Sequence, residues 1–411
     1  MMEMNPMILA GFAREDITPK IPVPMSGFDG IRIATGVHDP LYANVMVIKK
    51  NEELFVMSVL DLLSIDIELL SSVRSKIESL GMMKGCNVQI MATHTHSGPV
   101  GINDTETGIM EGSSYFLGNK DSHYINYVSE KIVQAIKSAV RNLQAQTIKI
   151  GKSTVSGISS NRSRKNDEYD NVVLAFEFSS ESNEKNLFLR FSCHPTVFDS
   201  SNTLISADFP ASLYQRYADK YKHTFFINGA CGDISTRHTR KSSDFNEIER
   251  MGRVLEEVIT ESLLAPFYEG TFDSFEMNSK CFTVETKKPG NIAELKRKYQ
   301  KMEEGIEKIS VRAELEYAKR QKQRPFLMEA GAVEIQGMKF TFLPVEIYSS
   351  LILAHLTENI FFSGFANGYY TYLPDSKAYE RGEYEAHMSP FAMGEGERLI
   401  SKVSKWLKEL E

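Results

Sequence analysis

The feature that most constrains this fold is an alternation of short apolar runs with longer amphipathic stretches through the first two-thirds of the chain. Apolar runs of strand length that alternate with helical periodicity favour an α/β architecture. We expect a large mixed-sheet catalytic domain flanked by helices. The expected strands are 43–50, 54–61, 87–92, 146–153, 171–178, 186–193 and 223–230, and the expected helices are 66–81, 124–143, 211–221 and 246–264.

The segment 291–324 differs from the rest because it is rich in Lys, Arg and Glu. The spacing of its apolar residues aligns one stripe along a helix. These residues are Ile292, Leu295, Tyr299, Met302, Ile306 and Ile309. The pattern predicts one long charged helix packed on its own domain, with a two-helix arm or a homo-oligomer contact as alternatives. A hairpin over 330–346 and a closing helix over 401–410 follow, and without a clear linker residues 1–411 are expected to form a single unit.

Charge and targeting signals narrow the classes of partner and compartment. The net charge of −7 argues against nucleic acid as a partner. The N-terminus has no basic region followed by an apolar one, and no apolar run approaches the roughly 20 residues of a membrane helix. The four cysteines lack C-x-x-C spacing and are interpreted as reduced thiols; they are Cys86, Cys193, Cys231 and Cys281. We therefore expect a cytoplasmic protein without a transmembrane segment.

Histidines stand at the ends of two predicted strands. In "QIMATHTHSGP", His94 and His96 are two residues apart and can face one pocket. In "FSCHPTVF", His194 follows a second apolar strand, and "FLPVEIYSS" offers Glu346 in a similar position. Imidazole and carboxylate groups at neighbouring strand ends are typical of a metal site. Histidines that cap a turn or pack in the core are the alternative.

Two further stretches carry candidate binding groups. "NGACGDIS" ends a strand in a turn of small residues that includes Gly232 and presents Asp233 and Ser235. Such a turn can expose N–H groups to an oxyanion, although a simple tight turn with a capping Asp has the same pattern. The second stretch, 367–385, concentrates tyrosines that could line a pocket or pack over the core; they are Tyr369, Tyr370, Tyr372, Tyr379 and Tyr384.

Taken together, these segments resemble the neutral/alkaline non-lysosomal ceramidase family. The matching motifs occur in the same order along nearly the whole chain, and "THTHSGP" and "GDIS" are the most specific of them. The others are "AGFAREDITP", "MSGF", "GVHDPLYA", "SVLD", "SNRS", "CHPT", "LISADFP", "LPVE" and "NGYYTYLP…YERGEYE".

The resemblance implies a zinc-dependent amidase that cleaves the N-acyl bond of a ceramide-like sphingolipid with a metal-activated water. It implies that Zn²⁺ is held by His94, His194, Glu346 and Tyr372. It further implies catalytic roles for His96, Ser235 and Tyr384, the serine being a proposed nucleophile. It places Arg162, Gly232, Asp233 and Tyr370 among the residues that bind a small-molecule or lipid-like N-acyl substrate.

The chain also departs from the family pattern. Thr236 stands where the family usually has proline after the serine, and Val100 stands where it usually has glycine. We expect the catalytic domain without the C-terminal immunoglobulin-like domain of full-length ceramidases. An esterase or lactonase that uses the same zinc site, and a non-catalytic ligand-binding protein, are the alternative functions. A barrel-type amidohydrolase or a metallo-β-lactamase would need further His and Asp residues that the sequence lacks at the required places.

Overall fold

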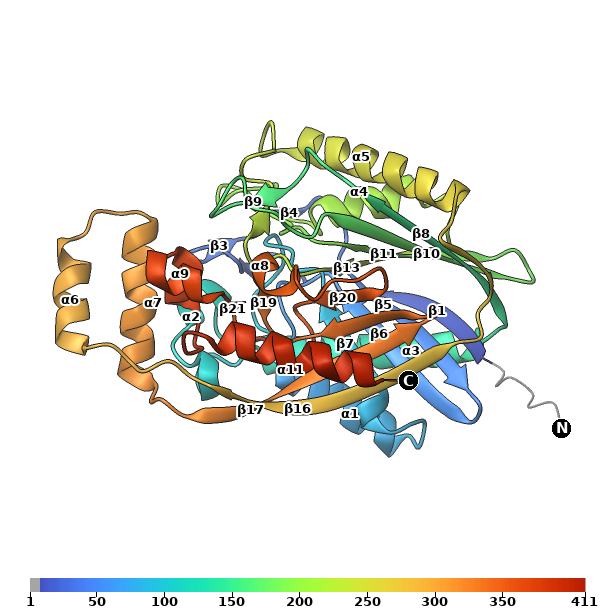
Figure 1. Cartoon of the computed structure of the whole chain (residues 1–411), viewed down its shortest axis with the longest axis horizontal. Helices are drawn as coiled ribbons and strands as arrows, with labels where there is room; N and C mark the ends of the chain where they lie inside the picture. The colour runs from blue at the N-terminus through green and yellow to red at the C-terminus, as the bar shows by residue number, and fades with distance from the viewer. Residues whose placement is uncertain (1–7, 411) are drawn as a thin grey trace.

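The computed structural model describes residues 8–410 and contains three main β-sheets (Figure 1). The first sheet has the order β1 (Ile8–Asp16), β5 (Tyr42–Lys50), β6 (Glu53–Leu60) and β7 (Val88–Ala92). The second has the order β13 (His223–Asn228), β11 (Lys185–Phe191), β10 (Val172–Ser180), β8 (Gln146–Thr154) and β15 (Tyr268–Thr271). The third has the order β16 (Phe275–Glu285), β17 (Pro325–Ile335), β18 (Met338–Phe342) and β20 (Ile360–Ser363).

Helices cover the outer faces of these sheets. α3 (Ser122–Arg141) packs on the first sheet with α1 (Ile67–Ser79) beside it, while α4 (Phe209–Arg216) and α5 (Phe245–Leu264) pack on the second. α11 (Glu395–Glu409) lies on the third sheet, across the front of the view in Figure 1. The predicted architecture, a mixed-sheet α/β domain flanked by helices, is confirmed.

Strands of all three sheets contribute to one apolar core. Strand β10 illustrates why the central strands are apolar along their whole length. Leu174, Phe176 and Phe178 belong to the core between the sheets, whereas Val173 and Ala175 face the core under the helices. A strand buried on both faces is a continuous apolar run rather than an alternation. Each such aromatic residue contributes about 1.5–3 kcal/mol through burial.

Two parallel strand pairs determine where the chain can place polar groups. α1 connects β6 to β7, and α4 lies between β11 and β13, so both pairs are parallel. The carboxyl ends of parallel neighbours lie at the same edge, and ligand sites form there. Asn228 ties the two edges together: its amide donates to the carbonyls of Thr93 at 3.1 Å and Cys193 at 3.0 Å, and its oxygen accepts from the N–H of Cys193.

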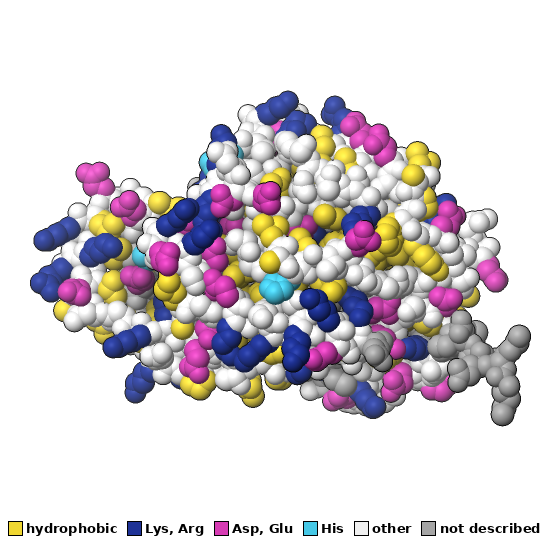
Figure 2. Space-filling model, viewed as in Figure 1, with side chains coloured by type: hydrophobic (Ala, Val, Ile, Leu, Met, Phe, Trp, Pro, Cys, Tyr) yellow, Lys and Arg dark blue, Asp and Glu magenta, His cyan; other side chains and the backbone are white. Residues whose placement is uncertain are grey.

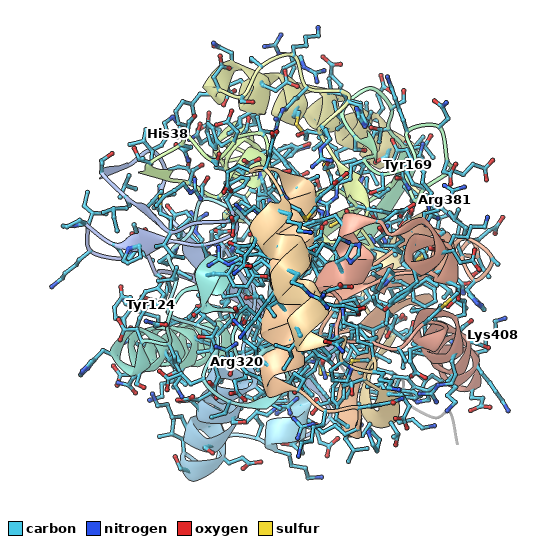
Figure 3. All side chains as sticks on the ribbon, turned by 90° about the vertical axis from the view of Figure 1, so that its left-hand side faces the viewer. His38, Tyr124, Tyr169, Arg320, Arg381 and Lys408 are labelled. Carbon is cyan, nitrogen blue, oxygen red and sulfur yellow. The ribbon has the colours of Figure 1, made fainter. Side chains whose placement is uncertain are left out.

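The prediction of one long helix over 291–324 is wrong. The segment forms two helices, α6 (Ile292–Lys301) and α7 (Ile306–Arg320), because Met302 adopts an extended conformation. The apolar stripe of α6 folds back on that of α7, so that Leu295 packs with Val311 and Leu315. This hairpin projects at the left of Figure 1 and faces the viewer in Figure 3, where Arg320 marks the end of α7. The alternative of a two-helix arm describes it.

Other local predictions are confirmed. β17 and β18 pair as an antiparallel hairpin around Gly337, which has a φ of 80°. α11 forms the closing helix. Within residues 8–410, no helix has both the length and the apolar character needed to span a bilayer. Acidic and basic side chains are interspersed over the face shown in Figure 2.

Candidate metal centre

Three histidine side chains converge where the two parallel strand pairs end. One nitrogen from each of His94, His96 and His194 lies within 4.8 Å of the other two. The Nε2 atoms of His94 and His96 are 3.1 Å apart, and the ring of His94 is edge-on to each of the other two rings. His94 and His194 are buried, and His96 is nearly so. Imidazoles gathered in this way can hold a transition metal.

His94 is oriented by the strand next to its own. It follows β7 and has a φ of 70°, an unusual backbone conformation for a residue with a side chain. Its N–H donates to the carbonyl of Leu62, and its Nδ1 donates to the carbonyl of Leu63 at 2.7 Å. The ring stacks on Phe365 with centroids 4.0 Å apart. Because Nδ1 carries the proton, Nε2 presents a lone pair to the centre.

His194 is held in the same way from the second strand pair. Its Nδ1 donates to the carbonyl of Cys231 at 2.6 Å and lies 3.1 Å from that of Ile234. Its backbone N–H donates to the carbonyl of Ile234. Burial lowers the pKa of His94 to about 3 and lowers that of His194 well below its ordinary value. Both imidazoles are therefore neutral lone-pair donors near pH 7.

Glu346 adds a buried carboxylate oxygen to this cluster of imidazole nitrogens. Its Oε2 lies 2.9 Å from Nε2 of His194 and 3.6 Å from Nε2 of His94. Despite this closeness, neither Oε2 of Glu346 nor Nε2 of His194 makes a hydrogen bond, and both atoms are buried. A carboxylate lone pair facing an imidazole lone pair at this distance is repulsive unless a proton or a metal ion lies between them, and burial raises the pKa of Glu346. The residues present therefore fit a bound metal ion.

Tyr372 lies beside this carboxylate because β19 (Glu346–Ile347) pairs in parallel with β21 (Tyr372–Leu373), with Glu346 opposite Tyr372. Its hydroxyl accepts a hydrogen bond from Arg162 at 3.0 Å. The guanidinium of Arg162 also donates to Glu385 and to the carbonyl of Gly232, both at 2.8–2.9 Å. Arg162 thus binds three groups of the chain through Nε and Nη2. Tyr384 lies next to Tyr372, with ring centroids 6.1 Å apart.

The predicted small-residue turn lies against the centre, and each of its three predicted residues has a distinct environment. A Cβ on Gly232 would come within 2.6 Å of the carbonyl oxygen of Glu346, so only glycine permits this approach. Asp233 accepts hydrogen bonds from Asn161 and from the backbone and hydroxyl of Ser349. The Ser235 hydroxyl accepts from the N–H of Arg237 at 3.2 Å. In the described part of the chain, no imidazole or carboxylate is hydrogen-bonded to Ser235.

Some residues at the centre were not predicted as site residues. Tyr369, rather than its neighbour Tyr370, contacts the candidate metal centre. Its hydroxyl donates a hydrogen bond to Oε1 of Glu346. Tyr370 packs instead against Phe326, with centroids 5.0 Å apart. Phe365 and Asn228 were also missed. The cluster of adjacent tyrosines was a signal, but sequence alone does not tell which ring points inward.

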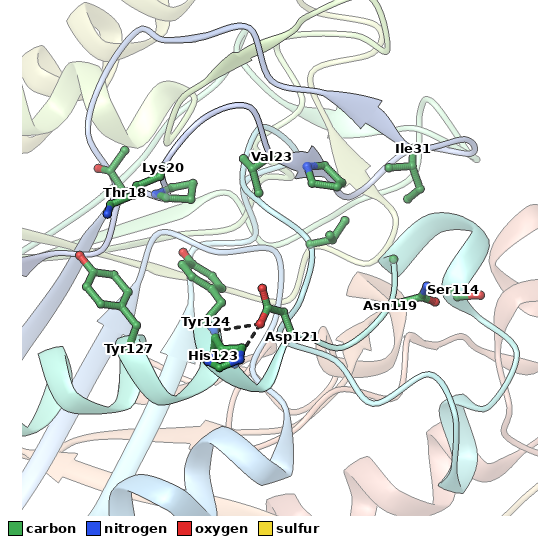
Figure 4. A pocket seen from close by; sticks show the side chains of 14 residues that line it. Thr18, Lys20, Val23, Ile31, Ser114, Asn119, Asp121, His123, Tyr124 and Tyr127 are labelled. Carbon is green, nitrogen blue, oxygen red and sulfur yellow. Dashed lines mark hydrogen bonds between the residues drawn. The ribbon is translucent and has the colours of Figure 1, made fainter.

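A large cavity is lined by residues other than those of the histidine cluster (Figure 4). It has a volume of about 940 Å³ and is lined by residues from segments 18–31 and 100–127. The second segment includes the start of α3. Its apolar residues include Val23, Pro24, Ile31 and Val100. Val100 donates its N–H to the carbonyl of Pro24, and the same segment continues to Gly27, which packs on His96. The segment that lines the cavity at Pro24 therefore contacts His96 three residues later, at Gly27.

An α/β fold that gathers imidazole, carboxylate and phenol groups at strand ends is typical of hydrolase domains that bind a catalytic metal. The family model of neutral/alkaline non-lysosomal ceramidase, N-terminal, matches residues 8–218, and the chain belongs to this family. The resemblance seen in the sequence motifs is thereby confirmed, and amide hydrolysis is the activity that the family implies.

Two solved structures share the fold. A structure described as ceramidase complexed with C2 has a TM-score of 0.74 and 18% identity, over 98% of this chain and 76% of that chain. A neutral ceramidase from Pseudomonas aeruginosa also has a TM-score of 0.74 and 18% identity, over 99% of this chain and 75% of that chain. At this identity the likeness is one of fold.

Proposed function

We propose that this protein is a zinc-dependent hydrolase that cleaves the amide bond of a lipid-like N-acyl substrate. The observation that carries the proposal is the approach of two buried lone pairs, on Nε2 of His194 and Oε2 of Glu346, to 2.9 Å without a hydrogen bond. Neutral histidines and a carboxylate are ligands that zinc prefers. Family membership supports amide hydrolysis as the reaction.

The metal would be held by His94, His194, Glu346 and Tyr372. The first three are supported by the distances among their side-chain atoms, and Tyr372 by its position opposite Glu346. A bound zinc ion would supply Lewis-acid activation of water and of the amide carbonyl. Carbonyl groups from the neighbouring strands hold both histidines in the tautomer that leaves Nε2 free, which prepares them for this role.

The remaining candidates surround the ligands. We assign proton transfer to the departing amine to His96, because its Nε2 faces the same space as the ligand atoms. Tyr384 would donate a hydrogen bond to the oxyanion. Arg162 and Gly232 would position Tyr372 and Glu346, and Asp233 would hold the turn through Ser349. In this proposal, residues from His94 to Tyr384 act together in one active site.

The acyl chain of the substrate would occupy the cavity shown in Figure 4. Its volume of about 940 Å³ and its apolar walls suit an alkyl chain. Pro24 and Val100, which pair through a backbone hydrogen bond, line this cavity, and Gly27 in the same segment as Pro24 packs on His96. We expect Val100→Trp to lower kcat/KM for long-chain amides more than for acetyl amides.

The substitution Glu346→Gln tests the metal site without relying on activity. Its amide would donate a hydrogen bond to Nε2 of His194 and so remove the repulsion between lone pairs. We expect the variant to lose zinc, while its metal-free form is more stable than the metal-free wild type by about 1 kcal/mol. Metal content is measured by mass spectrometry and stability by urea unfolding in chelator. A variant that still binds stoichiometric zinc, or is less stable without metal, would contradict the assignment.

A further inference from the structure

The ring of His96 is held differently from the other two rings of the histidine cluster. The Nδ1 atoms of His94 and His194 donate to backbone carbonyls, whereas Nδ1 of His96 is buried without a hydrogen-bond partner in the described part of the chain. Nε2 of His96 lies 3.1 Å from Nε2 of His94, the atom that would bind a metal ion in the proposed function. With that lone pair occupied, packing alone would orient the His96 ring.

The segment 26–32 supplies this packing. A Cβ on Gly27 would come within 2.7 Å of Nδ1 of His96, so the backbone of Gly27, which has a φ of 101°, lies directly against this nitrogen. The next side chain, Phe28, packs its ring on that of His96 in an edge-to-face arrangement, with centroids 5.2 Å apart. These two contacts restrict the rotamers that the His96 side chain can adopt.

Arg32 connects this segment to the turn that carries His96. Its Nη2 donates to the carbonyl of His96 at 2.6 Å and to that of Ser26 at 3.1 Å. Its Nη1 donates to the carbonyl of Asn202 at 2.7 Å. The same guanidinium lies over the ring of Phe28, 4.7 Å from the centroid, so Phe28 contacts both Arg32 and His96. A planar guanidinium can make all of these contacts at once.

The cation of Arg32 is costly for folding alone. Within residues 8–410 its guanidinium forms no ion pair, and its Nε is buried without a hydrogen-bond partner. Burial lowers the pKa of Arg32 to about 10, while Asp199 acts in the opposite sense, so the side chain is charged near pH 7. A partly buried cation without a carboxylate partner lowers stability, and local costs of this kind are common at functional sites.

We propose that Arg32 and Phe28 are positioning residues that hold the imidazole of His96 in the orientation needed for proton transfer. This inference rests on the proposed function, in which His96 protonates the departing amine. Proton transfer requires the donor nitrogen to stay within hydrogen-bond reach of its acceptor, so a ring that turns away loses turnover while the metal ligands stay in place. Loss of either positioning residue should therefore act on kcat, and only where His96 is present.

The first test is a double-mutant cycle, with N-dodecanoylethanolamine as the substrate and released ethanolamine as the measured product. We expect Arg32→Ala and Phe28→Leu each to lower kcat of the zinc-loaded enzyme by about tenfold to a hundredfold, with KM within about twofold and zinc content unchanged. In a His96→Ala background the same substitutions should change kcat by less than about twofold, because the group that they position is gone. Arg32→Lys should fall between Arg32→Ala and the wild type, since lysine keeps the charge without the planar fork.

Arg398→Ala is the matched control, because Arg398 also donates to a backbone carbonyl, that of Thr283, but lies on α11. It should leave kcat within about twofold of the wild type. Equal losses of kcat with and without His96, or loss of zinc from Arg32→Ala and Phe28→Leu, would overturn the positioning role. If Arg32→Ala does not fold, Phe28→Leu decides alone, because the partly exposed ring of Phe28 makes none of these hydrogen bonds.

A second test does not depend on hydrolysis. In protein with isotope-labelled histidine and excess Zn²⁺, the NMR signals of the His96 ring are assigned by their absence from His96→Ala. We expect one sharp set of these signals in the wild type and broadened or doubled signals in Arg32→Ala and Phe28→Leu, because the ring then exchanges between orientations. The signals of His194, which the carbonyl of Cys231 holds, should stay sharp.

The two tests separate this inference from the proposed function. Sharp single signals of His96 in both variants would overturn the positioning role and leave the hydrolase intact. A wild type that hydrolyses no N-acyl amide would contradict the hydrolase, and the NMR signals of His96 would still decide whether Arg32 and Phe28 hold its ring.

Discussion

The β6–β7 pair and the β11–β13 pair each supply one histidine, and in each pair a backbone carbonyl orients the imidazole, but the surrounding contacts differ. In the first pair the histidine follows the second strand, β7, and a carbonyl beyond β6 orients it. In the second pair the histidine follows the first strand, β11, and a carbonyl beyond β13 orients it. His94 depends on one carbonyl, an unusual φ and a stacked ring, whereas His194 is fixed by the turn at 231–234.

This difference shows that a tautomer can be selected by any backbone carbonyl that the fold places behind the ring. We call the β6–β7 pair with His94 the first half of the site and the β11–β13 pair with His194 the second half. In both halves the carbonyl lies just beyond the parallel strand next to that of the histidine. The first half adds aromatic packing from Phe365, and the second adds hydrogen bonds within a tight turn. We therefore expect the halves to respond alike to loss of a ligand and differently to changes around it.

The largest effect should come from removing either histidine. We expect His94→Ala and His194→Ala each to lower zinc affinity by more than about a hundredfold and to abolish hydrolysis. The measurement is competitive titration with a metal-binding dye. His355→Ala, outside the cluster, serves as the control. Retention of zinc by one of the two variants would show that the halves are not equivalent.

His96→Ala should have the next largest effect, and on turnover alone. Removal of a proton-transfer group lowers kcat by about 10²- to 10⁴-fold. We expect the zinc content of this variant to stay near that of the wild type. If zinc is lost together with activity, His96 is itself a ligand and the first half supplies two of them.

Asn228→Ala should uncouple the two halves. The substitution leaves the carbonyls of Thr93 and Cys193 buried without their shared donor, which costs about 2–3 kcal/mol of unfolding free energy. We expect kcat/KM to fall by about tenfold because both histidine turns relax. Urea unfolding and steady-state kinetics measure the two effects. Asn142→Ala, at the C-terminal end of α3, removes one 3.4 Å hydrogen bond to the carbonyl of Phe12 and should change neither by a comparable amount.

The smallest effect is expected for Ser235→Ala. Since the described residues place no base beside the hydroxyl, activity should remain within about tenfold of the wild type. Loss of activity beyond about a thousandfold, with zinc retained, would instead identify Ser235 as the nucleophile. In that case the two strand pairs would differ in function, because the β11–β13 side would supply both a metal ligand, His194, and the attacking group, Ser235.

Much of this fold follows from local pattern. β10 and α3 were predictable because burial on both faces and a 3.6-residue period leave direct traces in the sequence. The break between α6 and α7 was not, because an apolar stripe keeps its spacing whether it lies on one helix or folds back on itself. The extended conformations of Met302 and Gly305 distinguish the two.

The part of the candidate site that lies at strand ends was predictable from the sequence. His94 and His194 stand directly after apolar runs, so their convergence follows from parallel pairing. The contacts that orient them involve backbone carbonyls of Leu63 and Cys231, which any residue could supply. Which of Tyr369 and Tyr370 faces Glu346 depends on the local backbone at Gly368 and Thr371, where φ is positive.

The position of Glu346 far along the chain has a consequence for biosynthesis. While the ribosome has exported only the first 300 residues, both imidazoles are outside the exit tunnel but the carboxylate and the phenol have not been made. The third sheet, whose strand β18 precedes Glu346, is synthesised after the other two. A cation acquired earlier would be held by an incomplete set of ligands, so loading with metal and completion of the polypeptide should coincide.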